Sequence, residues 1–167
     1  ALWCETVMAY LTDQQLKDLG LACCGTNVCI SDKASIYCPE NLHIASNVRI
    51  DDYSIITAQG GVSIGNYVHI AAYSAIFGGS GVELSDFSGM SPRCTIFSES
   101  DDFSGQSMIH PFFPMEYKPR YERGKVVLEK YVQLGASTIV LPGCEIQEGS
   151  VTGANSLVIK SLSGWGI

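Results

Sequence analysis

Long apolar runs and clusters of basic residues are both missing from this chain of 167 residues. No run approaches the roughly 18 apolar residues that a membrane-spanning helix needs. The first ten residues also lack the basic start and the apolar core of a signal peptide. Lysine and arginine total 10 against 17 aspartate and glutamate residues, which gives a net charge of −7. This acidic balance disfavours nucleic acid as a partner, so we expect neither nucleic-acid binding nor membrane insertion.

Cysteine patterns typical of disulfide frameworks or metal sites are missing as well. The seven cysteines are odd in number, and no two of them form a Cys-x-x-Cys pair. Cys94 and Cys144 stand where the repeat described below calls for a small apolar residue. Free thiols in a reducing compartment are the expected state of such residues. The cysteines therefore predict a cytoplasmic location.

Neither helical nor alternating strand periodicity accounts for the sequence, but a six-residue spacing of aliphatic side chains does. Up to Ile96, positions three steps apart in this series, such as Ile44, Ile64 and Leu84, are separated by 20 residues. A period of six is typical of a parallel β-helix, in which each hexapeptide forms one side of a triangular coil. We therefore predict an all-β fold of this kind, with one aliphatic residue per hexapeptide pointing inward. The predicted inward positions are Ile30, Ile36, Ile44, Ile50, Ile56, Ile64, Ile70, Ile76, Leu84, Met90, Ile96, Leu128, Leu134, Val140, Ile146, Thr152 and Val158.

Two segments depart from the repeat. Thr12 and Gln15 have the spacing of a capping box, which predicts a short helix over 13–19 that closes the first coil. Residues 1–27 are accordingly an N-terminal extension with a capping helix, and residues 28–167 form the β-helix domain. Within that domain the step from Ile96 to Leu128 is 32 residues, so a loop is inserted over about 98–126. Long excursions from a regular scaffold are commonly functional.

The repeated coils with a single long interruption resemble the hexapeptide-repeat acyltransferases. The resemblance covers the chain from about residue 12 to its end, and it is strongest to the branch of galactoside, maltose and xenobiotic O-acetyltransferases. Within that branch the chain looks most like acetyltransferases that act on sugars, including nucleotide-linked 4-amino-4,6-dideoxy sugars. The segments that carry the resemblance are KASIYCPENLHIASNVRIDDYSII, SESDDFSGQSMIHPFFPMEY and VVLEKYVQLGASTIVLPGCEIQEGSVTGANSLVIKS.

The resemblance implies a left-handed coil, a homotrimer with its sites between neighbouring subunits, and acetyl-CoA as the donor. It also implies direct transfer of the acetyl group to a hydroxyl or an amine of a sugar or nucleotide sugar. Acyl transfer from a thioester requires a base for the acceptor proton and hydrogen-bond donors for the oxyanion, but no metal. The prediction is thus an acetyl-CoA-dependent acetyltransferase with a histidine as general base.

The candidates for the base include the three histidines, His43, His69 and His110. In the family the catalytic histidine follows the coil before the loop, and this chain has Asp101 at that position, with Asp102 next. We prefer His69, which is expected at an outward corner one coil before the loop, assisted by one of these two aspartates. His110 is the alternative if the loop folds back over the site. A carboxylate base, or a simple turn at the two aspartates, also remains open.

The resemblance places CoA along the coils that follow the loop. Small residues there would let the pantetheine arm approach the backbone, and Gly135 and Gly153 are spaced so that one stacks on the other. Many relatives have a tryptophan over this arm where the chain has Gln133, and Lys160 is a candidate contact for the CoA phosphates. The candidate CoA-binding residues are Gln133, Gly135, Ala136, Gly153, Ala154 and Lys160.

Three other functions are considered. A non-catalytic β-helix scaffold or binding protein is favoured by the missing histidine at the family position and by Gln133. A xenobiotic (antibiotic) acetyltransferase shares the position of the loop. A β-helix carbonic anhydrase would need three histidines on one zinc ion across a subunit interface, and the different coil offsets of His43, His69 and His110 argue against it.

Overall fold

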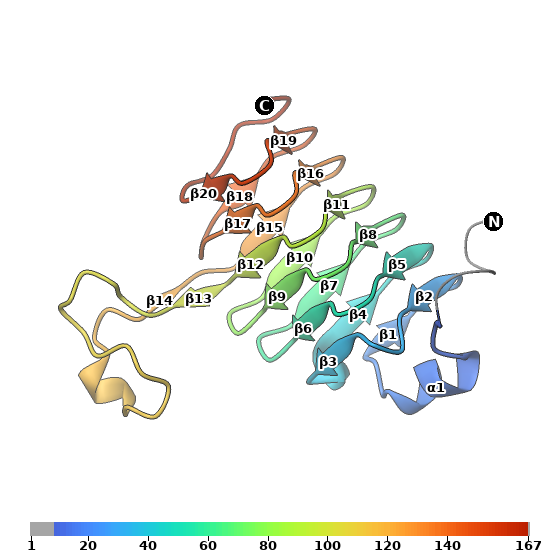
Figure 1. Cartoon of the computed structure of the whole chain (residues 1–167), viewed down its shortest axis with the longest axis horizontal. Helices are drawn as coiled ribbons and strands as arrows, with labels where there is room; N and C mark the ends of the chain where they lie inside the picture. The colour runs from blue at the N-terminus through green and yellow to red at the C-terminus, as the bar shows by residue number, and fades with distance from the viewer. Residues whose placement is uncertain (1–8, 167) are drawn as a thin grey trace.

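The computed structural model describes residues 9–166, which form a parallel β-solenoid with one short α-helix at its N-terminal end (Figure 1). Three six-stranded parallel sheets make up the walls of the solenoid. The first sheet contains β1 (Cys23–Cys24), β4 (Leu42–Ile44), β7 (Val62–Ile64), β10 (Val82–Leu84), β15 (Val126–Leu128) and β18 (Glu145–Ile146). The second contains β2 (Val28–Ile30), β5 (Val48–Ile50), β8 (His69–Ile70), β11 (Gly89–Met90), β16 (Gln133–Leu134) and β19 (Val151–Thr152). The third contains β3 (Ser35–Tyr37), β6 (Ile55–Thr57), β9 (Ala75–Phe77), β12 (Thr95–Phe97), β17 (Ile139–Val140) and β20 (Leu157–Val158).

The stacking of the coils follows the repeat predicted from the sequence. Ile44 pairs with Ile64, and Ile64 with Leu84, in the first sheet. Leu84 then pairs with Leu128, so the coil after the inserted loop stacks directly on the coil before it. The predicted inward aliphatic side chains are buried in a single core, except that Ile36 at the end of the solenoid is only partly buried. Thr152, the one polar residue among the predicted inward positions, is also buried. Each buried aliphatic side chain stabilises the fold by about 1.5–3 kcal/mol, so the repeat itself holds the coils together.

Aromatic residues occupy tight corners of the coils, which the sequence did not predict. Tyr67, Phe87 and Tyr131 have φ values of 58°, 63° and 63°, a left-handed conformation that costs an L-residue roughly 1–2 kcal/mol. Their rings stack coil upon coil, with centroids 5.1 and 5.3 Å apart. Tyr53 and Tyr73 stack in the same way at the next corner, 5.1 Å apart. These aromatic columns border the second sheet on both sides and partly offset the backbone strain.

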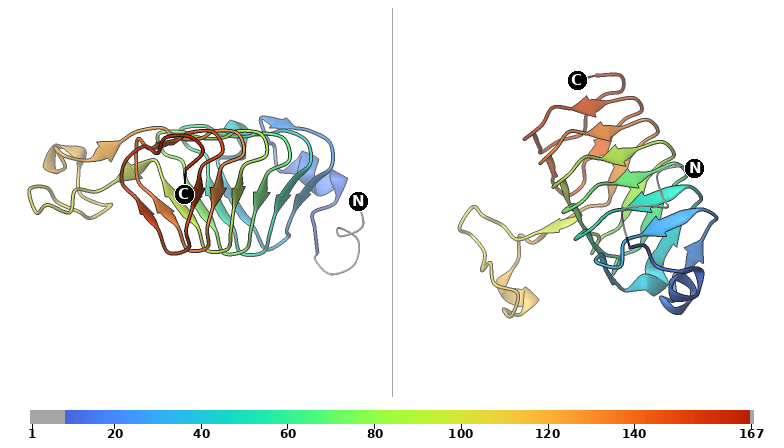
Figure 2. Two further views of the ribbon diagram at one scale, coloured as in Figure 1. Left: turned by 90° about the horizontal axis from the view of Figure 1, so that it is seen from above. Right: turned by 45° about the vertical axis from the view of Figure 1, so that its right-hand side comes forward.

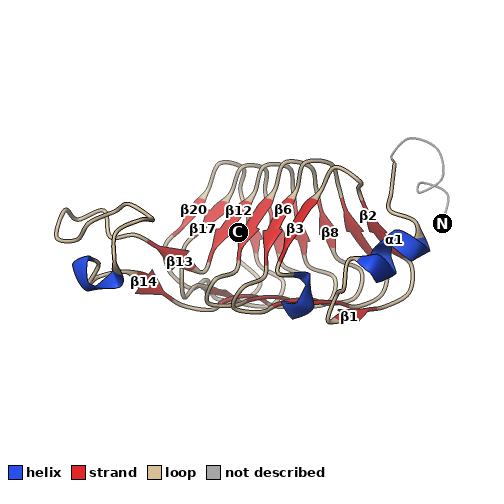
Figure 3. Ribbon diagram, turned by 90° about the horizontal axis from the view of Figure 1, so that it is seen from below, coloured by secondary structure: helices blue, strands red, loops and turns tan. Residues whose placement is uncertain are grey.

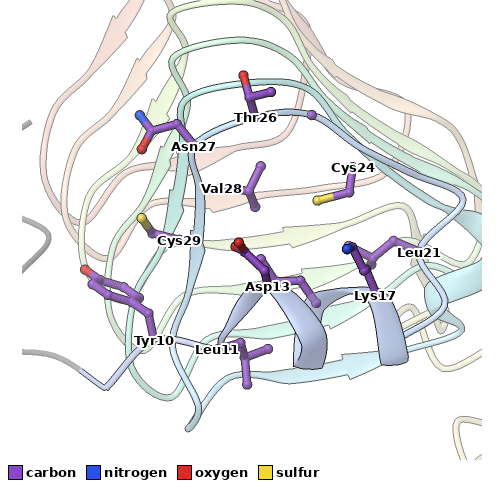
Figure 4. Close-up of a pocket in the computed structure, with 12 residues that line it drawn as sticks. Tyr10, Leu11, Asp13, Lys17, Leu21, Cys24, Thr26, Asn27, Val28 and Cys29 are labelled. Carbon is purple, nitrogen blue, oxygen red and sulfur yellow. The ribbon is translucent and has the colours of Figure 1, made fainter.

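The N-terminal end of the solenoid is covered by α1 (Asp13–Asp18), and the predicted capping box is confirmed. The Gln15 N–H donates to the Thr12 hydroxyl, and the Thr12 N–H donates to the Gln15 side chain. Leu16 is buried against the core, but a cavity of about 860 Å³ remains between α1 and the first coil (Figure 4). β1 already pairs with β4, so the first coil begins inside the segment 1–27 that the sequence assigned to the extension. Residues 1–8 of that segment lie outside the described residues.

The inserted loop leaves the solenoid as an arm, here defined as residues 98–126, between β12 and β15. Its root is a two-stranded antiparallel ribbon of β13 (Glu99–Ser100) and β14 (Glu122–Arg123), and its tip contains the 3-10 helix η2 (Met115–Tyr117). A second 3-10 helix, η1 (Pro39–Asn41), lies within the first coils. Figures 1, 2 and 3 show the arm projecting away from the coils. Phe103 and Phe112 on the arm are 80% and 90% exposed, an unusual state for large apolar side chains.

No helix within residues 9–166 has both the length and the apolar character needed to cross a membrane.

Candidate active site

His69 lies on the outer face of the second sheet and is paired with Asp51 from the coil below. Its Nε2 is 2.8 Å from Asp51 Oδ2, and the other carboxylate oxygen accepts a hydrogen bond from Arg49 Nε at 2.6 Å. The Asp51 side chain is 8% exposed, whereas that of His69 is 50% exposed. A carboxylate can only accept a hydrogen bond, so Asp51 fixes the proton on Nε2 and leaves Nδ1 as the basic nitrogen. Among the described residues His69 Nδ1 has no hydrogen-bond partner, so it is available to a substrate.

A depression beside His69 provides room for reacting groups. We call it the Gly89 depression, because Gly89, which pairs with His69 in the sheet, is one of the residues that line it. Its volume is about 330 Å³. Ser91 is the one hydroxyl-bearing residue that lines it. The lining residues are Asp51, His69, Ala71, Ala72, Gly89, Met90, Ser91, Pro92 and Gln133.

Asp101 and Asp102 lie at the root of the arm, and the structure pairs them with groups other than His69. Asp101 accepts a hydrogen bond from Lys118 Nζ at 2.8 Å, and the Lys118 side chain is only 5% exposed. Asp102 accepts from both the N–H and the hydroxyl of Ser104 at 2.8 Å. These bonds hold the pKa of the Asp102 carboxyl below its usual value, which makes it a poor base. Within one chain the carboxylate paired with His69 is therefore Asp51, and assistance from Asp101 or Asp102 stays a prediction.

The other two histidines lie apart from the Gly89 depression. His110 is on the exposed arm, where its Nδ1 accepts the Phe112 N–H at 3.3 Å and its ring contacts Phe113. Because the arm extends away from the coils (Figure 1), His110 does not fold back over the site of its own chain. His43 lies on β4 in the first sheet. No group of three or more metal-ligating side chains occurs in the part of the chain that the structure describes.

Some of the small residues in the coils after the arm are needed for packing against the next coil, whereas others leave space for a ligand. Gly135 and Gly153 are stacked, as predicted, because Leu134 pairs with Thr152. A Cβ on Gly135 would lie 2.5 Å from Thr152 O and 2.7 Å from the carbonyl carbon of Gly153. The Gly135 N–H is also used, since it donates to Thr152. The missing side chain of Gly135 is therefore explained by coil stacking, and a contact between its backbone and pantetheine stays a prediction.

Gly153 remains open to a ligand. A Cβ there would meet only Ser156 Oγ, at 3.8 Å. Gly153 and Lys160 line the same cavity of about 260 Å³ at the C-terminal end of the described coils. Ala154 follows in the same corner and is exposed, whereas Ala136, one coil below, is half-buried. The candidate CoA residues thus separate into Gly135, which serves the fold, and a set that remains accessible.

A matched pair of substitutions tests this distinction. We expect Gly135→Ala to destabilise the protein by roughly 1–3 kcal/mol, because its Cβ overlaps backbone atoms that cannot rotate away. Gly153→Ala should change the free energy of unfolding by less than about 0.5 kcal/mol, as surface substitutions usually do. Chemical denaturation of both variants and the wild type measures the difference. Equal stability of the two variants would mean that Gly135 has no special role in stacking.

Two parts of the site were not identified from the sequence. Asp51 directly follows the inward residue Ile50, and its carboxylate reaches His69 across one coil. The available signal is a separation of 18 residues in a coil of 20 (51 to 69), which brings the two side chains close but slightly offset. Ser91 and Gly89 flank the inward Met90 in the next coil. A register built from the repeat would have brought these residues together.

Comparison with known proteins gives the family. No family model matches the chain. It is 44% identical over 152 residues to the dTDP-4-amino-4,6-dideoxy-D-glucose acyltransferase of Escherichia coli, which covers 90% of this chain and 79% of the relative. AntD, an N-acyltransferase from Bacillus cereus solved with dTDP and 3-hydroxybutyryl-CoA, matches at 44% identity with a TM-score of 0.92. That match covers 95% of this chain and 84% of AntD.

An AntD variant solved with dTDP-4-amino-4,6-dideoxyglucose and coenzyme A matches at 43% identity, with the same TM-score of 0.92 and the same coverage of 95% and 84%. The chain therefore belongs to the hexapeptide-repeat β-helix acyltransferases.

Proposed function

We propose that the protein is an acyl-CoA-dependent N-acyltransferase that acts on the 4-amino group of dTDP-4-amino-4,6-dideoxyglucose. The likeness to the Escherichia coli enzyme over 90% of the chain carries this proposal. It is supported by the Asp51–His69 pair at 2.8 Å beside the Gly89 depression, because a half-exposed histidine held by a buried carboxylate has the form of a general base. The acceptor is accordingly an amine rather than a hydroxyl. The donor is an acyl-CoA, of which acetyl-CoA is the simplest.

In the proposed reaction the sugar amine attacks the thioester carbonyl of acyl-CoA. The new C–N bond forms as the amine nitrogen becomes positively charged, and the carbonyl oxygen becomes an oxyanion. His69 Nδ1 takes the proton from that nitrogen, and Asp51 stabilises the imidazolium through Nε2. The C–S bond then breaks, and the thiolate of CoA leaves with the proton that His69 returns. The hydroxyl of Ser91, a residue that lines the same depression, is the proposed donor to the oxyanion.

The donor arm is proposed to lie along the coils above the depression. Gln133 lines the depression itself, and Gly153 and Lys160 line the cavity at the C-terminal end of the described coils. Gly153 lets pantetheine approach the backbone, whereas the Lys160 ammonium suits a phosphate of CoA. Ala136 and Ala154, at the corner between them, complete a path of small residues.

A thiol-release assay tests the proposed activity. The purified protein is mixed with acetyl-CoA or 3-hydroxybutyryl-CoA and either dTDP-4-amino-4,6-dideoxyglucose or a hydroxyl acceptor such as a galactoside. We expect CoA release only with the amino sugar nucleotide. Release with the galactoside alone would assign O-acyl transfer instead. Absence of release with every acceptor, in a protein that still binds CoA, would favour the non-catalytic scaffold.

The assembly is proposed to be a homotrimer. The apolar side chains of the arm are exposed in the single chain, with Phe112 at 90%, and neighbouring copies would cover them. A closed cyclic assembly uses the same contact three times and leaves no unmatched surface. Light scattering should therefore give a mass of about 54 kDa, three times the 18.0 kDa of one chain. A mass near that of one chain would contradict this.

A further inference from the structure

The outward row of the second sheet contains one position without a side chain, and it lies at the depression. Register pairs His69 with Gly89 and Gly89 with Gln133. The outward residues of the row, in order along the solenoid, are Cys29, Arg49, His69, Gly89, Gln133 and Val151. A Cβ on Gly89 would lie 2.5 Å from Gln133 Oε1. The Gln133 side chain therefore occupies the space that the glycine leaves, so the two residues act as a unit.

The Gln133 amide is held in a defined orientation. Its Nε2 donates a hydrogen bond to the Phe87 carbonyl at 3.0 Å, and Phe87 is fixed in turn by the stacked column of aromatic rings. A primary amide has two N–H donors and one carbonyl acceptor. One N–H is used by Phe87, which leaves the other N–H and Oε1 to serve a ligand. A polar group thus lies at the upper wall of the depression, next to Gly89.

The depression combines this amide with an apolar interior. His69 bounds it below and Gln133 bounds it above, while Ala71, Ala72 and Pro92 line it in between. An acetyl group has no polar atom beyond its carbonyl, so it could not use the Gln133 amide. A longer acyl chain with a hydroxyl substituent would place its carbons against the apolar lining and its hydroxyl within reach of the amide. This combination of contacts fits a hydroxyacyl group.

We propose that the Gly89 depression is the subsite for the acyl group of the donor, and that Gln133, seated over Gly89, selects a hydroxyacyl-CoA over an unsubstituted acyl-CoA. This inference rests on the proposed N-acyl transfer and adds the chemical class of the donor. Gln133 is a specificity-determining residue and takes no part in bond making or breaking. A site that hydrogen-bonds a substrate hydroxyl discriminates against the analogue that lacks it, because the amide is otherwise left unpaired.

The test compares kcat/KM for acetyl-CoA, butyryl-CoA and 3-hydroxybutyryl-CoA at saturating acceptor. The wild type should use 3-hydroxybutyryl-CoA about tenfold better than butyryl-CoA, the effect of one additional hydrogen bond. Gln133→Leu keeps the bulk and removes the amide, so the ratio of kcat/KM for 3-hydroxybutyryl-CoA to kcat/KM for butyryl-CoA should fall to about one, whatever the change in overall activity. Gly89→Ala should act in the same direction, because its methyl group displaces the Gln133 amide. Gln59→Leu is the matched control, since Gln59 is exposed and outside the depression.

Calorimetry with the same three CoA thioesters separates this inference from the proposed reaction. If the protein transfers no acyl group at all, the proposed function is wrong, but a tighter Kd for 3-hydroxybutyryl-CoA that is lost in Gln133→Leu still supports the subsite. If transfer occurs and Gln133→Leu lowers kcat/KM equally for all three donors, or changes none of them, Gln133 does not read the acyl group. Equal Kd values for butyryl-CoA and 3-hydroxybutyryl-CoA in the wild type would also overturn the inference.

Discussion

His69→Ala is expected to lower kcat by roughly 10²–10⁴-fold, the usual contribution of a general base. The physical reason is that Nδ1, the nitrogen left basic by the bond from Nε2 to Asp51, has no substitute among the residues that line the depression. The Kd for CoA should stay near the wild-type value, because the base contacts the acceptor amine and not the pantetheine. Steady-state kinetics and calorimetry on the same preparation measure both quantities.

Substitution of the other candidates provides the controls. His43→Ala removes an exposed outward histidine from a different sheet and should leave kcat unchanged. If His69→Ala is fully active and Asp101→Asn is not, the general base is the Asp101 carboxylate at the root of the arm. If only His110→Ala is inactive, the arm of a neighbouring copy brings the base. Loss of activity in His69→Ala alone supports the arrangement with Asp51.

Gly153→Trp is expected to abolish CoA binding while the protein stays folded. The space beside Gly153 is open, so an indole can be accommodated outside the solenoid, where it would fill the proposed path of the pantetheine arm. Gly153→Ala adds a single methyl group at the same place and should retain binding. Calorimetric titration with CoA, together with thermal unfolding of each variant, separates a blocked site from a damaged fold. An unchanged Kd in a folded Gly153→Trp variant would place CoA elsewhere.

Much of the fold could be predicted because it depends on one strong periodic signal. Steps of 20 residues place Ile44, Ile64 and Leu84 above one another, and the structure pairs them in that order. Leu128 could be added to the same column across the arm, because the inward residue of a hexapeptide is aliphatic regardless of what is inserted before it. The capping box of Thr12 and Gln15 was likewise a local signal, and local hydrogen bonds need no tertiary information.

The site was less predictable because it depends on contacts between coils. His69 was selected as an outward histidine, but its partner Asp51 comes from the coil below, and its offset from the 20-residue register hid the pairing. Gly135 had the composition expected of a ligand groove, yet its missing side chain is explained by the backbone stacked on it. The seating of Gln133 over Gly89 depends on a rotamer, which no spacing in the sequence specifies.

Identifying the chemical bond in the product tests the central claim, N-acyl transfer to the amino sugar, most directly. The protein is incubated with an acyl-CoA and dTDP-4-amino-4,6-dideoxyglucose, and the purified product is examined by mass spectrometry and NMR. N-acyl transfer predicts a mass increase of one acyl group and an amide proton coupled to the hydrogen at C4 of the sugar. An ester at a sugar hydroxyl, or recovery of unmodified amino sugar from a protein that binds both substrates, would contradict it.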